Sequence, residues 1–114
     1  MEPTSAETVR RRFARTPVKA NAFVNHGSRF QRAQIVDYSL GGLQLDGTFG
    51  LIARDNVQIE LMCGARVRGT VAWSLGGRTG VVFPEPLPET HPAVTTLARR
   101  AGRAHAAQAL AHSA

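Results

Sequence analysis

The chain between residues 18 and 83 consists largely of short segments in which apolar and polar residues alternate, and these segments limit the possible folds. Alternation with a period of two is typical of β-strands that bury one face. Glycines follow most of the segments, as in tight turns between antiparallel strands. We expect strands over residues 18–24, 33–39, 43–46, 57–61, 67–73 and 80–83. Five or six such strands favour a small antiparallel β-barrel, because closing the sheet leaves no exposed edge.

A different composition begins at residue 84 and predicts a connector followed by one helix. Three prolines within residues 84–88 favour extended chain, and Pro92 suits the first position of a helix. Residues 93–112 are rich in alanine, the best helix former. Apolar residues at helical spacing indicate that this helix packs on the barrel, and they are Val94, Leu97, Ala98 and Ala101. Leu110 does not continue this stripe, so we expect the segment after Gly102 to fray or turn away.

The length of 114 residues is that of a single domain. We expect a flexible N-terminal arm over residues 1–9, a barrel with an arginine cluster over 10–87, and a C-terminal helix and tail over 88–114. The fold class is therefore all-β with one C-terminal helix. No apolar run approaches the roughly 18–20 residues of a membrane span, and the N-terminus does not resemble a secretory signal. Cys63 is the one cysteine and cannot form an internal disulfide, so these features predict a cytoplasmic protein.

Positive charge is concentrated in the first third of the sequence. The chain has 14 Lys and Arg residues against eight Asp and Glu, a net charge of +6. Residues 1–32 hold seven of these cations and two of the acids, so seven minus two, or +5, of the total lies there. Such a segment attracts anions, which include nucleic acid, a nucleotide and an acidic membrane surface. All but one of the cations are arginine, whose forked guanidinium suits phosphates and guanine edges.

The arginine cluster has the spacing needed to converge on one ligand. Arg11 and Arg15 are four residues apart, which places them on one face of either a helix or a strand, and Arg10 and Arg12 lie beside them. Each guanidinium can donate two parallel hydrogen bonds to a phosphate, or to O6 and N7 of guanine. The alternative interpretation of this cluster is a solvated basic arm.

A second polar group occupies residues 37–42, Asp-Tyr-Ser-Leu-Gly-Gly. In a strand, Asp37 and Ser39 project from the same face. An ionised aspartate only accepts hydrogen bonds, which suits the N1–H and N2–H2 donors of guanine, and a serine hydroxyl can donate or accept. Gly41 and Gly42 allow the backbone to approach a ligand or to adopt positive φ. The alternative is a β-turn in which the aspartate and serine side chains bond their own backbone.

Taken in order, the two groups resemble the motifs of the PilZ domain family. In that family an Arg-x-x-x-Arg arm is followed, after a strand, by Asp-x-Ser-x-x-Gly. Arg11 and Arg15 fill the first motif, and Asp37, Ser39 and Gly42 fill the second. Further segments similar in order and spacing to the later strands of the family are residues 39–43, 69–73 and 80–83.

The resemblance implies a receptor for the bacterial second messenger cyclic di-GMP. Family members are six-stranded antiparallel β-barrels, and they are not enzymes and need no cofactor. The arginine motif would lie on an N-terminal loop that folds over the ligand. A chain of this size has no output domain, so ligand-induced ordering of the arm would signal to an unidentified effector protein.

The resemblance also assigns a role to each motif residue. The implied ligand-binding residues are Arg10, Arg11, Arg12, Arg15, Asp37, Ser39, Gly41 and Gly42. The arginines would contact phosphates and guanines, with Arg12 as a helper, while Asp37 would read a guanine Watson–Crick edge and Ser39 would bond base or phosphate. The two glycines would let the backbone approach the ligand. An arginine directly before the motif, here Arg10, is linked in this family with an intercalated ligand dimer.

Two alternatives of other kinds stay open. One is a PilZ-like barrel without a ligand that serves only as a protein-interaction module. The other is a small basic barrel that binds single-stranded nucleic acid without sequence specificity. The aromatic content of 6% argues against a surface on which nucleic-acid bases stack. Binding of single-stranded nucleic acid should weaken steeply with salt, whereas binding of cyclic di-GMP should weaken less.

We expect the remaining reactive and aromatic residues to have structural roles and no role in ligand binding. The four histidines and Cys63 show no spacing typical of metal ligands, so no metal site is expected. Cys63 is expected to be a small buried side chain, and Trp73 a residue of the barrel core. Tyr38 alternates out of phase with its neighbours Asp37 and Ser39, so we expect it on the opposite side of the strand.

Overall fold

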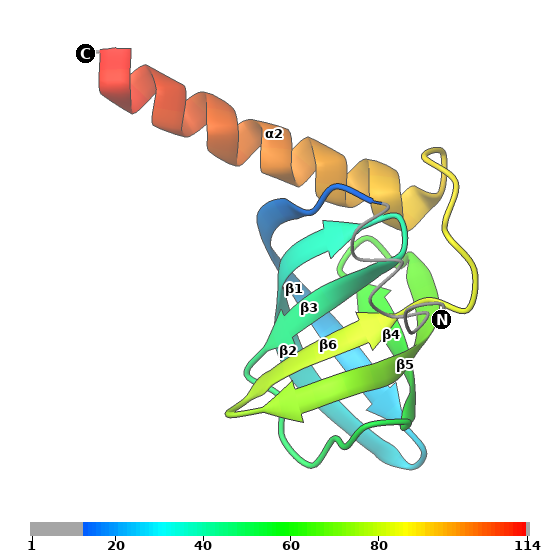
Figure 1. Cartoon of the computed structure of the whole chain (residues 1–114). Coiled ribbons are helices and arrows are strands. Elements are labelled where there is room, and N and C mark those ends of the chain that lie inside the picture. The colour runs from blue at the N-terminus through cyan, green and yellow to red at the C-terminus, as the bar shows by residue number, and fades with distance from the viewer. Residues whose placement is uncertain (1–12, 114) are drawn as a thin grey trace, which may run out of the picture.

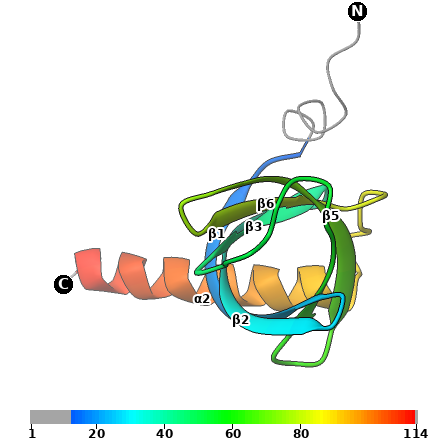
Figure 2. The same ribbon diagram turned by 90° about the horizontal axis from the view of Figure 1, so that it is seen from below.

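Six antiparallel strands close into a barrel, and a long helix lies across one end of it (Figure 1). The computed structural model describes residues 13–113, with side chains described for residues 13–102. The elements are β1 (Thr16–His26), β2 (Arg29–Ser39), β3 (Gly42–Asp46), β4 (Asn56–Leu61), β5 (Arg66–Leu75), β6 (Arg78–Val82) and α2 (Pro92–Ser113). Around the barrel the order is β1-β2-β3-β6-β5-β4, and Figure 2 shows the closed ring of strands. The predicted fold class is confirmed.

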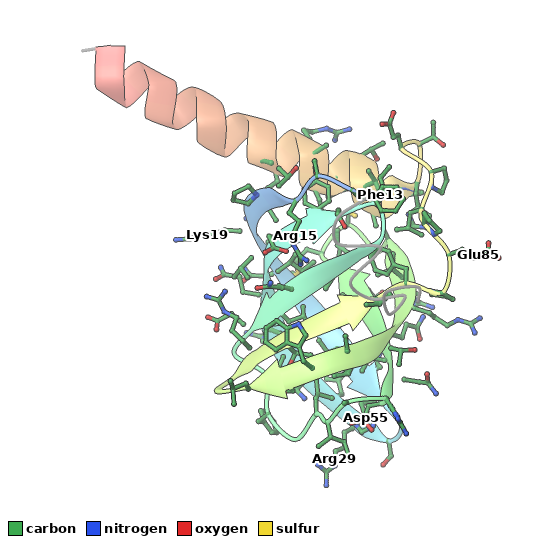
Figure 3. All side chains as sticks on the ribbon, viewed as in Figure 1. Phe13, Arg15, Lys19, Arg29, Asp55 and Glu85 are labelled. Carbon is green, nitrogen blue, oxygen red and sulfur yellow. The ribbon has the colours of Figure 1, made fainter. Side chains whose placement is uncertain are left out.

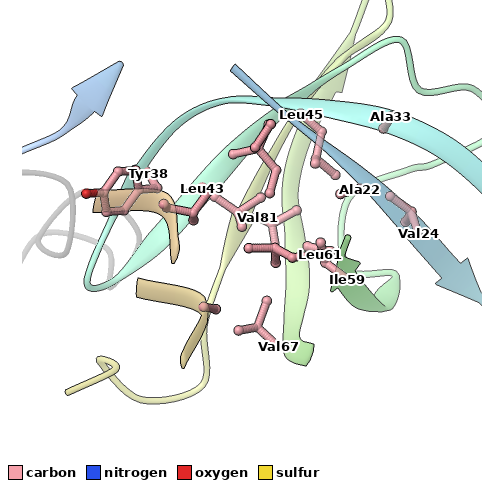
Figure 4. Close-up of a cluster of buried hydrophobic side chains, with 14 of the residues drawn as sticks. Ala22, Val24, Ala33, Tyr38, Leu43, Leu45, Ile59, Leu61, Val67 and Val81 are labelled. Carbon is pink, nitrogen blue, oxygen red and sulfur yellow. The ribbon is translucent and has the colours of Figure 1, made fainter. Parts of the chain in front are cut away.

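The alternating pattern fills the barrel interior with apolar side chains. In β1 the four predicted inward residues, Val18, Ala20, Ala22 and Val24, are each at most 6% exposed. All six strands contribute to the most deeply buried side chains. These are Val24, Ile35, Leu43, Leu45, Ile59, Val71 and Thr79. Figure 4 shows several of them converging from different strands. Full burial of a Val, Leu or Ile side chain stabilises the fold by about 1.5–3 kcal/mol, so this cluster is its main support.

The strands extend further toward their turns than the alternation predicts. β2 begins at Arg29 rather than at residue 33, because its backbone keeps pairing with β1 as far as His26↔Arg29, where the side chains no longer alternate in burial. The connection between β5 and β6 is a tight turn at Gly76-Gly77, with φ of 59° and 83°. Glycine tolerates such positive angles without the strain that a Cβ would add.

Two bulges change which side chains face the interior. The register shifts between Ile35 and Asp37 in β2, and between Val71 and Trp73 in β5. Beyond a bulge the inward and outward positions exchange, since one strand has an extra residue. Tyr38 is therefore buried, at 8% exposure, and Asp37 is turned outward, as expected. The expectation for Trp73 is wrong, because this side chain lies outside the core cluster and is only half-buried.

The helix α2 covers one open end of the barrel. It begins at Pro92, as predicted, and it buries Ala93, Val94 and Leu97. These side chains, with Leu43 and other barrel residues, enclose a space of about 10 Å³, which is too small for a ligand. We expected fraying or a change of direction after Gly102, whereas the helical backbone continues to Ser113 and extends past the barrel in Figure 1. No helix among the described residues is both long and apolar enough to cross a membrane.

Candidate ligand-binding site

The two sequence motifs meet at Arg15 and Asp37. Arg15 directly precedes β1, and the pairing of Pro17 with Asp37 brings the start of β1 beside the end of β2. The Arg15 guanidinium donates from Nη2 at 2.8 Å and from Nε at 3.3 Å to Oδ1 of Asp37. The two side chains are 30% and 22% exposed, so the pair is open to solvent and to a ligand. In Figure 3, Arg15 lies near the end of the barrel that α2 covers.

Ser39 takes part in the turn between β2 and β3. Its hydroxyl accepts a hydrogen bond from Gly41 N at 3.2 Å and lies 3.5 Å from the carbonyl oxygen of Gly42, to which it donates. Ser39 is 6% exposed. The turn is also fixed from outside, because Gly41 O accepts a hydrogen bond from Phe83 N at 2.9 Å. The alternative interpretation of this motif, a turn that bonds its own backbone, is thus present for Ser39, and a ligand would have to compete with these hydrogen bonds.

Gly42 is needed for the close approach of two strands. It pairs with Val82 of β6, and a Cβ at this position would overlap the carbonyl oxygen of Val81. Its φ lies outside the left-handed region, so the steric contact and not the backbone angle excludes a side chain. The structure therefore gives this motif glycine a role in barrel closure.

A row of residues across the outer face connects Asp37 with Trp73. Asp37 pairs with Gln44 of β3, Gln44 with Gly80 of β6, and Gly80 with Trp73 of β5. The Trp73 indole covers Gly80, because a Cβ there would overlap its Nε1, Cε2 and Cδ1 atoms. Directly paired residues project from one face of a sheet. The row thus has a carboxylate at one end and a half-buried aromatic ring at the other.

The sequence reasoning missed Gln44, Gly80 and Trp73 as parts of this face. Alternation alone assigns Trp73 to the core, since it follows Val67 and Val71 at even spacing. The bulge before Trp73 reverses that assignment, and no residue type in the segment marks it. One signal in the sequence could have indicated the position of Trp73. A glycine paired with an aromatic residue on the neighbouring strand, here Gly80, leaves room for the ring to lie over that strand.

The other predicted site residues fall outside this description. Arg10, Arg11 and Arg12 precede residue 13 and so lie outside the described residues. Within residues 13–102, no group of three or more histidine, cysteine, aspartate and glutamate side chains is placed to hold a metal ion. The site is thus described by Arg15, Asp37 and their neighbours on the outer face.

The prediction that Cys63 is buried is wrong, because this residue is exposed in the turn between β4 and β5. Its Sγ lies 3.4 Å from Oγ1 of Thr96 in α2. The hydrogen bond from Thr96 lowers the pKa of the thiol, and backbone hydrogen bonding at Ala65 and the charge of Arg99 act in the same direction. The thiolate is therefore more populated near neutral pH than in an ordinary cysteine.

This pKa direction predicts how Cys63 reacts. Its alkylation by iodoacetamide should rise with pH and level off at a lower pH than for a free thiol. Thr96→Val removes the hydroxyl, returns the thiol pKa toward its ordinary value and slows alkylation at pH 7.5 by about threefold. Thr96→Ser keeps the hydroxyl and serves as the control. Equal rates in the Val variant and the parent would contradict the role of Thr96.

The fold and site together define the class of the protein. It is a small antiparallel β-barrel with a partly exposed Arg15–Asp37 pair on its outer surface, while its interior is filled by side chains.

A comparison with protein families gives the more specific assignment. The family model of the PilZ domain matches residues 9–99, and the chain belongs to the PilZ domain family. The resemblance found in the sequence is thereby confirmed, and with it the assignment to a family of cyclic di-GMP-binding receptor modules rather than enzymes. A search of curated proteins finds no match to this chain.

Proposed function

We propose that this chain is a cyclic di-GMP receptor that binds its ligand on the outer face of the barrel around Asp37. The observation that carries the proposal is the Arg15–Asp37 pair, with N–O distances of 2.8 and 3.3 Å. It brings the last arginine of one motif into contact with the first residue of the other. A ligand that carries both phosphates and guanines needs donors and an acceptor within reach of each other, and this pair supplies both.

The two side chains have complementary tasks in this proposal. Both hydrogen bonds from Arg15 end on Oδ1 of Asp37, and a carboxylate can accept about four. Asp37 accepts from N1–H and N2–H2 of a guanine. Arg15 donates to a phosphate and can stack its guanidinium plane on a base. Ser39 contributes to the ligand once its hydroxyl exchanges a turn hydrogen bond for one to base or phosphate.

The outer-face row adds an apolar surface to these polar groups. Neighbouring strands are about 4.8 Å apart, so Gly80 lies roughly 10 Å from Asp37 across β3. That separation suits a guanine held by Asp37 at one end of the ligand and a second purine over the Trp73 indole at the other. Stacking of a base on an aromatic ring contributes about 1–3 kcal/mol.

In this proposal, the ligand regulates the protein by ordering the arm that precedes Arg15. We infer that Arg10, Arg11 and Arg12 contact the phosphates and draw the arm over the ligand, with Gly41 allowing close backbone approach. New charge-assisted hydrogen bonds can order a segment and expose a new surface to a partner. The partner is an effector protein of the cytoplasm that distinguishes the ordered arm from the free one.

The test is a calorimetric titration of the purified chain with cyclic di-GMP, with GMP as control, at 50 and 300 mM salt. We expect saturable binding of cyclic di-GMP, weak or no heat with GMP, and a modest loss of affinity at the higher salt. A stoichiometry of two would support the ligand dimer linked with Arg10. No saturation would overturn the proposal and favour a ligand-free interaction module, whereas binding of single-stranded DNA with a steep salt dependence would favour the nucleic-acid alternative.

A further inference from the structure

The end of the barrel opposite α2 is formed by three neighbouring loops, which we call the loop end. It comprises residues 26–30, 47–55 and 75–78. In Figure 3, Arg29 and Asp55 mark this end, and Arg15 lies at the other. The loop end is therefore distinct from the Arg15–Asp37 pair and has no role in the function proposed above, although Trp73 of the outer-face row lies in β5 only two residues before Leu75.

The loop end exposes bulky apolar side chains that lie outside the buried core, although one of them, Phe30, stacks on Phe23 of β1 with ring centroids 5.1 Å apart. They are Phe30, Phe49, Ile52 and Leu75, which are 61%, 68%, 68% and 79% exposed. Single exposed apolar residues are normal on a protein surface, but four of them on three adjacent loops form a patch of the kind found at docking surfaces.

The loops that carry these side chains are tied to one another. The side-chain amide of Gln31 donates to Phe49 O at 2.9 Å and accepts from Phe49 N at 3.0 Å. Thr48 donates to Gly77 O from both its backbone N and its hydroxyl, each at 3.1 Å. The first contact joins β2 to the 47–55 loop, and the second joins that loop to the β5–β6 turn. The apolar tips are thus held in place, and docking orders few additional groups.

The charges around the apolar tips are predominantly positive. Arg29 and Arg54 have no ion-pair partner among the described residues, and Arg54 is exposed on a backbone with a φ of 78°. The carboxylates at this end are already engaged. Asp46 pairs with Arg78 at 3.2 Å, and Asp55 faces His26 at 3.4 Å while accepting a backbone hydrogen bond.

We propose that the loop end docks this protein on a membrane surface that contains anionic lipids. Convex apolar tips can enter the boundary between headgroups and acyl chains, which deforms around them, whereas a protein partner would need a separate hollow for each tip. Guanidinium groups beside the tips bind lipid phosphates, and each cation near an anionic surface strengthens attachment. The Arg15–Asp37 pair, near the other end of the barrel, then lies away from the membrane.

The test measures binding of the full chain to vesicles by flotation, with phosphatidylcholine alone or mixed with phosphatidylglycerol. We expect binding to the anionic vesicles and much weaker binding to the neutral ones. Phe49→Ser with Ile52→Ser should reduce the partition coefficient about tenfold or more. Arg29→Gln with Arg54→Asn should reduce it about fivefold per charge and remove most of the preference for anionic lipid.

Two controls separate the loop end from other surfaces. Met62 is also 68% exposed but lies in the β4–β5 turn, so Met62→Ser should bind like the parent. Replacing Arg10, Arg11 and Arg12 with glutamine should lower affinity but preserve the effect of the Phe49 and Ile52 changes. The proposal is overturned if the parent binds neither vesicle, if it binds both equally, or if the Phe49 and Ile52 variant binds like the parent. A protein partner would then be the remaining occupant of the patch.

Discussion

Replacing Asp37 with alanine should weaken cyclic di-GMP binding by about thirty- to a hundredfold, which corresponds to roughly 2–3 kcal/mol. Asp37 is a carboxylate that faces the outer surface beside Arg15 of the other motif. Its removal leaves the guanine donors without a partner and releases Arg15 from its fixed position. Calorimetry measures the affinity, and quenching of the fluorescence of Trp73, the one tryptophan, gives a second readout.

The chain contains a matched control for this variant. Asp46 is also a strand carboxylate on the outer face, and Arg78 donates to it from Nε at 3.2 Å. Asp46→Ala removes an ion pair of the same chemistry outside the candidate site, so the affinity should stay within about twofold of the parent. If both variants lost affinity equally, the loss would reflect general charge and the assignment of Asp37 would be wrong.

Gly42→Ala should lower the free energy of unfolding by about 3 kcal/mol, with or without ligand. The added Cβ overlaps the Val81 carbonyl oxygen, so β3 and β6 must separate and their ladder hydrogen bonds lengthen. For a domain of this size the melting temperature should fall by roughly 10–20 °C. Thermal and urea unfolding, monitored by circular dichroism, measure the effect.

A second glycine separates steric overlap from loss of backbone freedom. Gly47 has a φ of 82°, and a Cβ there would meet nothing within 4 Å. Gly47→Ala should therefore show only the strain of a positive φ, about 1–2 kcal/mol. A Gly42→Ala variant as stable as the parent, but defective in ligand binding, would show that Gly42 serves the ligand and not the barrel.

The sequence predicts the barrel and helix well because each depends on a local pattern. The inward residues of β1 and the start of α2 at Pro92 follow directly from alternation and helix-start chemistry. What local pattern cannot predict is a bulge, because its extra residue is chosen by strand pairing across the sheet. The misplacement of Trp73 comes from such a bulge, and the exposure of Cys63 comes from a turn whose position depends on where β4 ends.

Only part of the candidate site could be predicted from the sequence. The convergence of Arg15 and Asp37 is present in the structure, although 22 residues separate them in sequence. The roles of the neighbouring motif residues could not be predicted, since Ser39 bonds its own turn and Gly42 faces a strand that lies 40 residues further along the chain, at Val82. Of these three positions in the second motif, only Asp37 presents its functional group outward, so the motif in part describes how the barrel is built.

The Arg15–Asp37 contact also bears on selectivity. Arg15 and Asp37 are each other's counter-ions, so a ligand that binds as proposed would exchange partners with the pair and not simply add to it. A free phosphate offers acceptors to Arg15 but nothing for the aspartate that it leaves behind, whereas a guanine nucleotide offers both an acceptor and a donor edge. Common cellular anions would thus gain little from breaking the pair, and a basic surface can remain available to a dilute messenger.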